Sequence, residues 1–168
     1  PLEDRFYEFL APNVRFNAIQ AAILKPQISG LDELINKKRE RAKLLDELFL
    51  PHIDKIKIQA KLEGAYCSYY SYPIYLDNSQ DRDNLVKKLK DDFNLICAYG
   101  YANPTPLYEC VNALIDPSKF GKSFAYSNRR YPSGTSPNAE DLLSRSFLIP
   151  FNENYSLEET HEIGERVI

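Results

Sequence analysis

The segment from Leu31 to Phe49 constrains the fold more than any other part of the sequence, because its apolar residues recur at steps of three and four. These residues are Leu31, Leu34, Ile35, Ala42, Leu45, Leu48 and Phe49. Basic and acidic residues interleave between them, which favours a solvated helix face with i,i+4 ion pairs over a nucleic-acid contact. We therefore expect a long amphipathic helix that packs along one side of the domain.

A shorter helix is predicted before this segment, over residues 16–24. Pro26 follows it, and because proline lacks an N–H and clashes with the preceding turn, it either kinks or ends the helix. The pair Ser29-Gly30 and the acids after it then mark a new helix start. Pro51 is expected to end the long helix.

The rest of the chain alternates between strand and helix patterns. Strands are predicted at residues 56–60, 66–76, 95–99 and 147–151, and helices at 81–93, from 136 and from the Ser156 capping box. Pro73 suggests an edge position or a bulge in its strand. In the helix at 81–93, the residues predicted to face inward are Leu85, Val86, Leu89 and Phe93. This order predicts an α/β (α+β) domain in which helices cover a small mixed sheet.

Composition limits the class of protein. A chain of 168 residues fits one domain, and a net charge of −3 gives no general attraction to nucleic acid or to an anionic membrane. Three scattered cysteines without a C-x-x-C pair argue against a disulfide framework or a zinc site, and so for a cytoplasmic setting. No apolar run has the length of a membrane span. We expect a piece of a longer product, because the chain begins at Pro1 and contains no methionine.

Two polar residues, Asn13 and Arg15, stand directly before the first helix. An amide and a guanidinium at a helix start suit the binding of an anion, phosphate in particular. The alternative is structural: Asn13 caps the helix and Arg15 pairs with a nearby carboxylate. The residues themselves leave both interpretations open.

Residues 100–136 form a long irregular segment that is rich in tyrosine and arginine. A connection of this length in a compact domain is usually functional or disordered. Its tyrosines and arginines, among them Tyr101, Tyr108 and Arg129, suit ligand recognition, because a phenol ring can stack on a ligand and a guanidinium can meet a phosphate. The alternatives are that the tyrosines pack their own segment and that Arg129 is solvated.

Several motifs together resemble the sugar aminotransferase family named after DegT, DnrJ and StrS. The first is Asn13-x-Arg15 followed by Gln20-Ala-Ala-Ile, and the later ones are Pro137-x-Ala139-Glu140, Leu148-Ile149-Pro150 and Ser156-Leu-Glu-Glu. The chain departs from the family at Ala18, where relatives usually carry a glutamate. The resemblance covers both ends of the chain in the right order, and it is to the C-terminal part of such an enzyme.

The resemblance implies the small C-terminal domain of a fold type I enzyme, at residues 13–168, preceded by the tail of a large domain at residues 1–12. The cofactor would be pyridoxal 5′-phosphate (PLP), with its Schiff-base lysine in the large domain, so no catalytic residue is expected in this chain. Asn13 would reach the cofactor phosphate in the neighbouring subunit of a homodimer with shared active sites, and Arg15 would lie close behind. Tyr101 and Tyr108 match the substrate-side loop.

The implied activity of the parent protein is transfer of an amino group from an amino-acid donor to a nucleotide-linked keto sugar; the fragment alone would be inactive. A sugar dehydratase of the same family is one alternative, because only the large domain separates the two. A non-catalytic interaction or regulatory module that kept the fold is another. Neither a nucleic-acid partner nor a membrane is expected.

Overall fold

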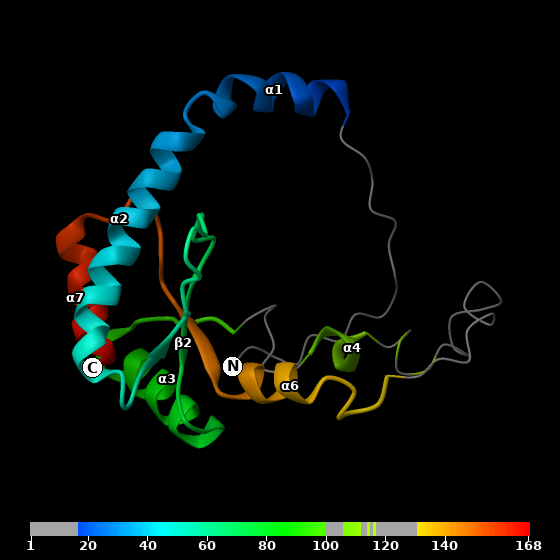
Figure 1. Ribbon diagram of the computed structural model, residues 1–168, viewed down its shortest axis with the longest axis vertical. Coiled ribbons are helices and arrows are strands. Elements are labelled where there is room, and N and C mark those ends of the chain that lie inside the picture. Colours follow the sequence, from blue (N-terminus) through cyan, green and yellow to red (C-terminus); the bar gives the residue numbers. More distant parts are fainter. Residues whose placement is uncertain (1–16, 100–105, 112–113, 115, 117–130) are drawn as a thin grey trace.

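The computed structural model describes residues 17–99, 106–111, 114, 116 and 131–168. The helices are α1 (Ala18–Ile28), α2 (Leu31–Phe49), α3 (Ser79–Phe93), α4 (Leu107–Cys110), α6 (Pro137–Ser144) and α7 (Leu157–Val167), with a short 3-10 turn at Leu50–His52. The strands are β1 (Lys57–Ile58), β2 (Tyr72–Tyr75) and β3 (Ser146–Ile149). The predicted fold class, helices on a small sheet, is confirmed (Figure 1).

The described strands form one sheet in the order β1-β2-β3, and both pairings are antiparallel. A mixed sheet was expected, but β1 and β2 are joined without a crossover helix, and a parallel pair needs such a crossover. Residues 95–99, predicted as a further strand, contribute a single bridge from Ala98 to Leu148, which is also antiparallel.

The hydrophobic core lies between one face of this sheet and helices α2, α3 and α7. The register pairs Tyr72 with Ile149 and Ile74 with Phe147, so these four side chains share a face. All four are buried, and the helices cover them with Ala42, Leu45, Phe49, Leu89 and Val167. The sheet and the helices thus form two layers around one core.

Pro73 lies in the central strand, not at an edge. Leu148, its partner in β3, makes both of its backbone hydrogen bonds with Ala98: its N–H donates to the Ala98 carbonyl at 2.6 Å, and its C=O accepts from the Ala98 N–H at 2.9 Å. Pro73 and Leu148 are therefore a pair without mutual hydrogen bonds, and β1 pairs only with Ile74 and Tyr75. The missing N–H of Pro73 removes no bond from the ladder, which explains how the central strand accepts it.

The predicted stripe of α2 is covered along its second half. Ala42, Leu45 and Phe49 are buried, whereas Leu31 is 48% exposed. On the solvated face, Lys37 lies 2.8 Å from Glu33, which is the expected i,i+4 pairing. The helix begins after Gly30 and ends at Phe49, as the sequence predicts.

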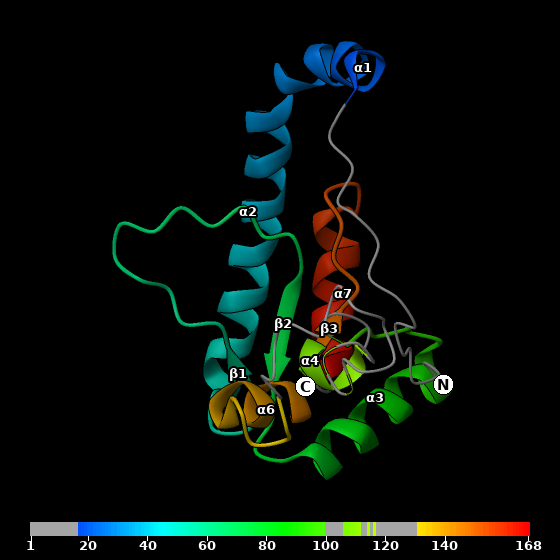
Figure 2. The ribbon, with the colours of Figure 1, turned by 90° about the vertical axis from the view of Figure 1, so that its right-hand side faces the viewer.

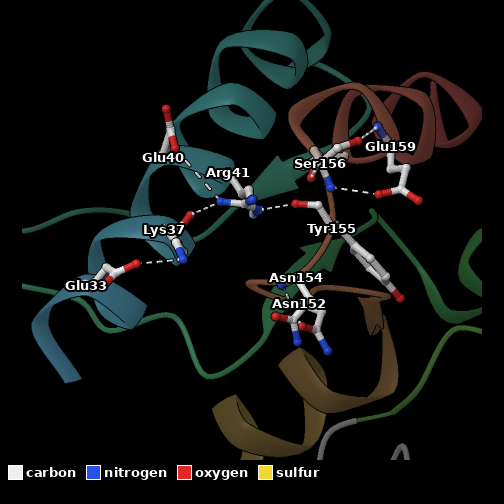
Figure 3. Close-up of polar contacts among 10 residues, drawn as sticks. Glu33, Lys37, Glu40, Arg41, Asn152, Asn154, Tyr155, Ser156 and Glu159 are labelled. Atoms are coloured by element: carbon white, nitrogen blue, oxygen red, sulfur yellow. Dashed lines mark hydrogen bonds and ion pairs between the residues drawn. The ribbon is translucent and has the colours of Figure 1, made fainter. Parts of the chain in front are cut away.

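Arg41 ties α2 to the start of α7 (Figure 3). Its side chain is buried, with the Nε donating to the Tyr155 carbonyl at 2.6 Å and one terminal nitrogen to the Lys37 carbonyl at 2.8 Å. Directly after Tyr155, the Ser156 hydroxyl accepts from the Glu159 N–H at 3.0 Å, and the Glu159 carboxylate accepts from the Ser156 N–H at 2.7 Å. The predicted capping box is confirmed, and it lies next to the α2 contact.

Helix α1 continues through Pro26 and ends two residues later, so the proline does not stop it at once. None of its residues is buried. Its exposed apolar side chains include Ile19, Ile23, Leu24 and Ile28. Figure 1 shows α1 extending from the start of α2, away from the sheet, and these side chains are 44–74% exposed.

Two further predictions are wrong in part. The predicted strand at 66–76 is reduced to Tyr72–Tyr75, since Tyr69 has a left-handed backbone with φ of 49° and Tyr70 is 91% exposed. Phe93 does not face inward; it is 41% exposed at the end of α3, where the Arg166 guanidinium lies over its ring. Asn94, directly after Phe93, ends α3 with φ of 53°.

Candidate functional site

Four of the five predicted site residues, namely Asn13, Arg15, Tyr101 and Arg129, lie outside the described residues. Their roles stay predictions. Tyr108 is the one that the structure describes, and the candidate site is built from its surroundings.

Tyr108 lies in α4, between the buried residues Pro106 and Cys110. Pro106 precedes the helix with φ of −59°, a value that suits the residue before a helical turn. The Tyr108 ring is tilted against the Tyr131 ring, with 6.4 Å between their centroids. Figure 1 shows α4 at the same end of the molecule as α6.

The Tyr108 hydroxyl donates a hydrogen bond to the Glu140 carboxylate in α6. It also accepts one from the Ser136 N–H at 3.1 Å. Partial burial and the bond to Glu140 raise the pKa of the Tyr108 hydroxyl above its usual value. Because its proton is held by Glu140, Tyr108 presents a ring face and a remaining lone pair, and not a free O–H donor, to any ligand.

Glu140 joins Tyr108 to the turn before α6. Its two carboxylate oxygens accept from the Gly134 N–H at 2.7 and 2.9 Å, and one accepts from the Ser136 N–H at 3.3 Å. Gly134 has φ of 89°, a left-handed conformation that favours glycine at this turn. These hydrogen bonds lower the pKa of Glu140 below its usual value, and the bond from Tyr108 has the largest effect.

Sequence reasoning gave Glu140 no role. Glu140 lies in the first turn of α6, where an acidic side chain is favoured by the positive helix end. Nothing in the sequence pattern indicates that its partner is Tyr108, 32 residues earlier. The described contacts of Tyr108 agree with the alternative in which it packs its own region.

Neither a membrane span nor a metal cluster is found in the part of the chain that the structure describes. No helix there is long and apolar enough to cross a bilayer. No group of three or more His, Cys, Asp or Glu residues there is arranged to hold a metal ion.

Solved structures show the same fold. The chain is similar to the aminotransferase TlmJ from Streptoalloteichus hindustanus, with 23% identity and a TM-score of 0.65 over 90% of this chain and 36% of TlmJ. It is similar to PseC from Helicobacter pylori, an aminotransferase involved in pseudoaminic acid biosynthesis, with 20% identity and a TM-score of 0.66 over 95% of this chain and 38% of PseC. The chain is also similar to a GDP-4-keto-6-deoxymannose-3-dehydratase with a trapped PLP-glutamate geminal diamine. The identity is 18% and the TM-score 0.61, over 96% of this chain and 38% of the dehydratase.

The chain thus spans well under half the length of these relatives. No curated protein matches it in sequence. The family model of the DegT/DnrJ/EryC1/StrS aminotransferase family matches residues 3–168, which confirms the resemblance drawn from the motifs. The chain therefore belongs to the DegT/DnrJ/EryC1/StrS aminotransferase family.

Proposed function

We propose that this chain is the C-terminal part of a PLP-dependent aminotransferase that transfers an amino group from an amino acid to a nucleotide-linked keto sugar. The observation that carries the proposal is the family match over residues 3–168. In this proposal residues 13–168 form the small domain, residues 1–12 are the tail of a large domain, and the protein works in the cytoplasm without nucleic acid.

Asn13 and Arg15 would hold the phosphate group of PLP. The chemistry of this pair supports the assignment, because an amide and a guanidinium both donate hydrogen bonds that a phosphate dianion accepts. When bound, PLP supplies the electron sink that amino-group transfer requires. The residues of this chain would position the cofactor from the phosphate side.

Tyr101, Tyr108 and Arg129 would contact the sugar nucleotide. For Tyr108, the bond to Glu140 supports a stacking role in which the ring face meets the sugar or base. Glu140 would then keep the ring in place while the substrate binds.

The exposed face of α1 supports a homodimer with shared active sites. Ile19 and Ile23, 74% and 60% exposed, lie four residues apart on the same side of a helix that directly follows Asn13 and Arg15 in sequence. An apolar helix face of this kind is normally covered in the working protein. Covering it with the neighbouring subunit would carry Asn13 toward that subunit's cofactor.

A sugar dehydratase is the second candidate, because a dehydratase shares this fold at a TM-score of 0.61. A non-catalytic module that kept the fold is a third. One experiment separates all three: the natural protein is incubated with PLP, glutamate and a nucleotide-linked 4-keto-6-deoxyhexose, and the products are identified by mass spectrometry.

An amino sugar together with 2-oxoglutarate is the expected result. A deoxygenated sugar without nitrogen as the product would mean that the protein is a dehydratase and not an aminotransferase. Unchanged substrate, with no PLP bound to the protein, would favour the hypothesis of a non-catalytic module.

A further inference from the structure

A cavity of about 420 Å³ lies between α2 and the segment that joins β1 to β2. This volume falls within the range of small-molecule sites, roughly 300–1,000 Å³. Figure 2 shows the joining segment swinging out beside α2, so the two walls come from parts of the chain that are distant in sequence. The wall residues that matter are Arg39, Lys43, Asp46, Lys61, Tyr66 and Tyr69. None of them belongs to the residues expected to hold cofactor or substrate.

The cavity carries an excess of positive charge, since Arg39, Lys43 and Lys61 face a single carboxylate, Asp46. Asp46 is already satisfied, because it pairs with Lys61 and accepts from the Tyr72 hydroxyl at 2.8 Å. Lys43 lies 3.6 Å from Glu47, but these side chains are 77% and 65% exposed, and such a pair contributes little. Arg39 and Lys43 therefore remain to attract an anion.

Arg39 is held in position by neutral partners. Its Nε donates to the Cys67 carbonyl at 2.8 Å, and its guanidinium lies over the Tyr66 ring. Within the described ranges no carboxylate pairs with it. A planar guanidinium fixed in this way presents its terminal N–H groups to an oxyanion as two parallel donors.

Tyrosine rings form the other wall. Tyr69 stacks on Tyr72, with centroids 6.5 Å apart and an interplanar angle of 14°. Tyr69 is held in the left-handed region, with φ of 49°, a conformation that is unfavourable for a non-glycine residue. Tyr72 is anchored in turn by Asp46. Tyr66, by contrast, is 77% exposed, so its ring is accessible to a ligand.

We propose that this cavity binds a small organic phosphate that carries a flat ring. Arg39 and Lys43 bind the phosphate, because their two charges match a dianion, and the tyrosine wall stacks on the ring. A nucleoside monophosphate is the simplest molecule of this class. The proposal does not rest on the aminotransferase activity, because it uses other residues.

The test is calorimetric titration of the natural, PLP-saturated protein with AMP, adenosine and inorganic phosphate. AMP is expected to bind at least tenfold more tightly than either of its two parts. Arg39→Gln should weaken AMP binding at least tenfold. The matched control, Lys87→Gln, removes the same charge from an exposed position of α3 and should change the affinity less than twofold. Tyr66→Leu, at an exposed position outside the core, should weaken AMP binding several-fold and phosphate binding less, because Arg39 keeps its bond to the Cys67 carbonyl.

Three results would overturn the proposal. The first is no AMP binding at millimolar concentration. The second is an equal loss in Arg39→Gln and Lys87→Gln, which would mean general charge attraction only. The third is inorganic phosphate binding as tightly as AMP, which would remove the ring from the recognition. A failed aminotransferase assay would not by itself contradict this proposal, because AMP binding is measured separately.

Discussion

At the scale of single residues, Glu140 has the most informative contacts, because one carboxylate holds the Tyr108 hydroxyl and the turn at Gly134. Glu140→Gln keeps the size and removes the charge. The pKa of Tyr108 should then fall toward its usual value, since a neutral amide no longer favours the protonated phenol. NMR titration of a ring-labelled Tyr108 measures this shift.

The control for this titration is Glu158→Gln, which removes an exposed acid from the first turn of α7. It should leave the Tyr108 titration unchanged. An identical Tyr108 titration in wild type and Glu140→Gln would show that the carboxylate does not govern the hydroxyl.

The candidate site could be predicted only in part at this scale. The resemblance to the family's substrate-side loop singled out Tyr108, and a phenol ring there suits recognition of a ligand. It did not reveal the bond to Glu140, because that contact joins residues 32 apart through a turn whose geometry depends on Gly134. Asn13, Arg15, Tyr101 and Arg129 stay predictions.

At the scale of elements, α7 packs closely against α2 at Gly164. A Cβ placed there would lie 2.5 Å from the Leu48 Cδ2 and 2.9 Å from the Leu45 Cδ2. Leu45 is 1% exposed and has no room to move away. Gly164→Val should therefore lower the free energy of unfolding by about 1–3 kcal/mol through overpacking.

Chemical denaturation with Glu165→Val as the matched control measures this cost. Glu165 is exposed on the same helix, so its replacement introduces the same β-branched side chain without the clash. A loss in Gly164→Val no larger than that in Glu165→Val would show that the added side chain meets no clash, and would contradict the close packing of α2 against α7.

Helix ends were predictable from local chemistry, whereas strand extents were not. The start of α2 after Gly30 and the start of α7 at the Ser156–Glu159 capping box depend only on residues close by in sequence. Both predicted positions are confirmed. The aromatic run before Tyr72 has the composition of a strand, yet Tyr69 turns left-handed there and stacks on Tyr72. The end of the strand therefore depends on tertiary packing, which cannot be predicted from the hydrophobic periodicity or the composition of the segment.

At the scale of the whole molecule, the described part has a core between its sheet and three helices, while α1 carries exposed apolar residues. The family relatives are much longer than this chain, and coverage of 36% to 38% leaves room in them for a further domain. Fold class and family followed from the motifs and the alternation of elements. The motifs and the periodicity do not determine the assembly or the substrate.

The most direct measurement of the central claim is the affinity of the natural protein for PLP in wild type and in Asn13→Ala, followed by absorbance. Loss of a hydrogen bond to a charged phosphate costs about 1.5–3 kcal/mol, so the affinity should fall about 10- to 150-fold. The control, Asn36→Ala at an exposed position of α2, should bind PLP as the wild type does. A wild-type protein that does not bind PLP, or an Asn13→Ala variant with unchanged affinity, would contradict the account.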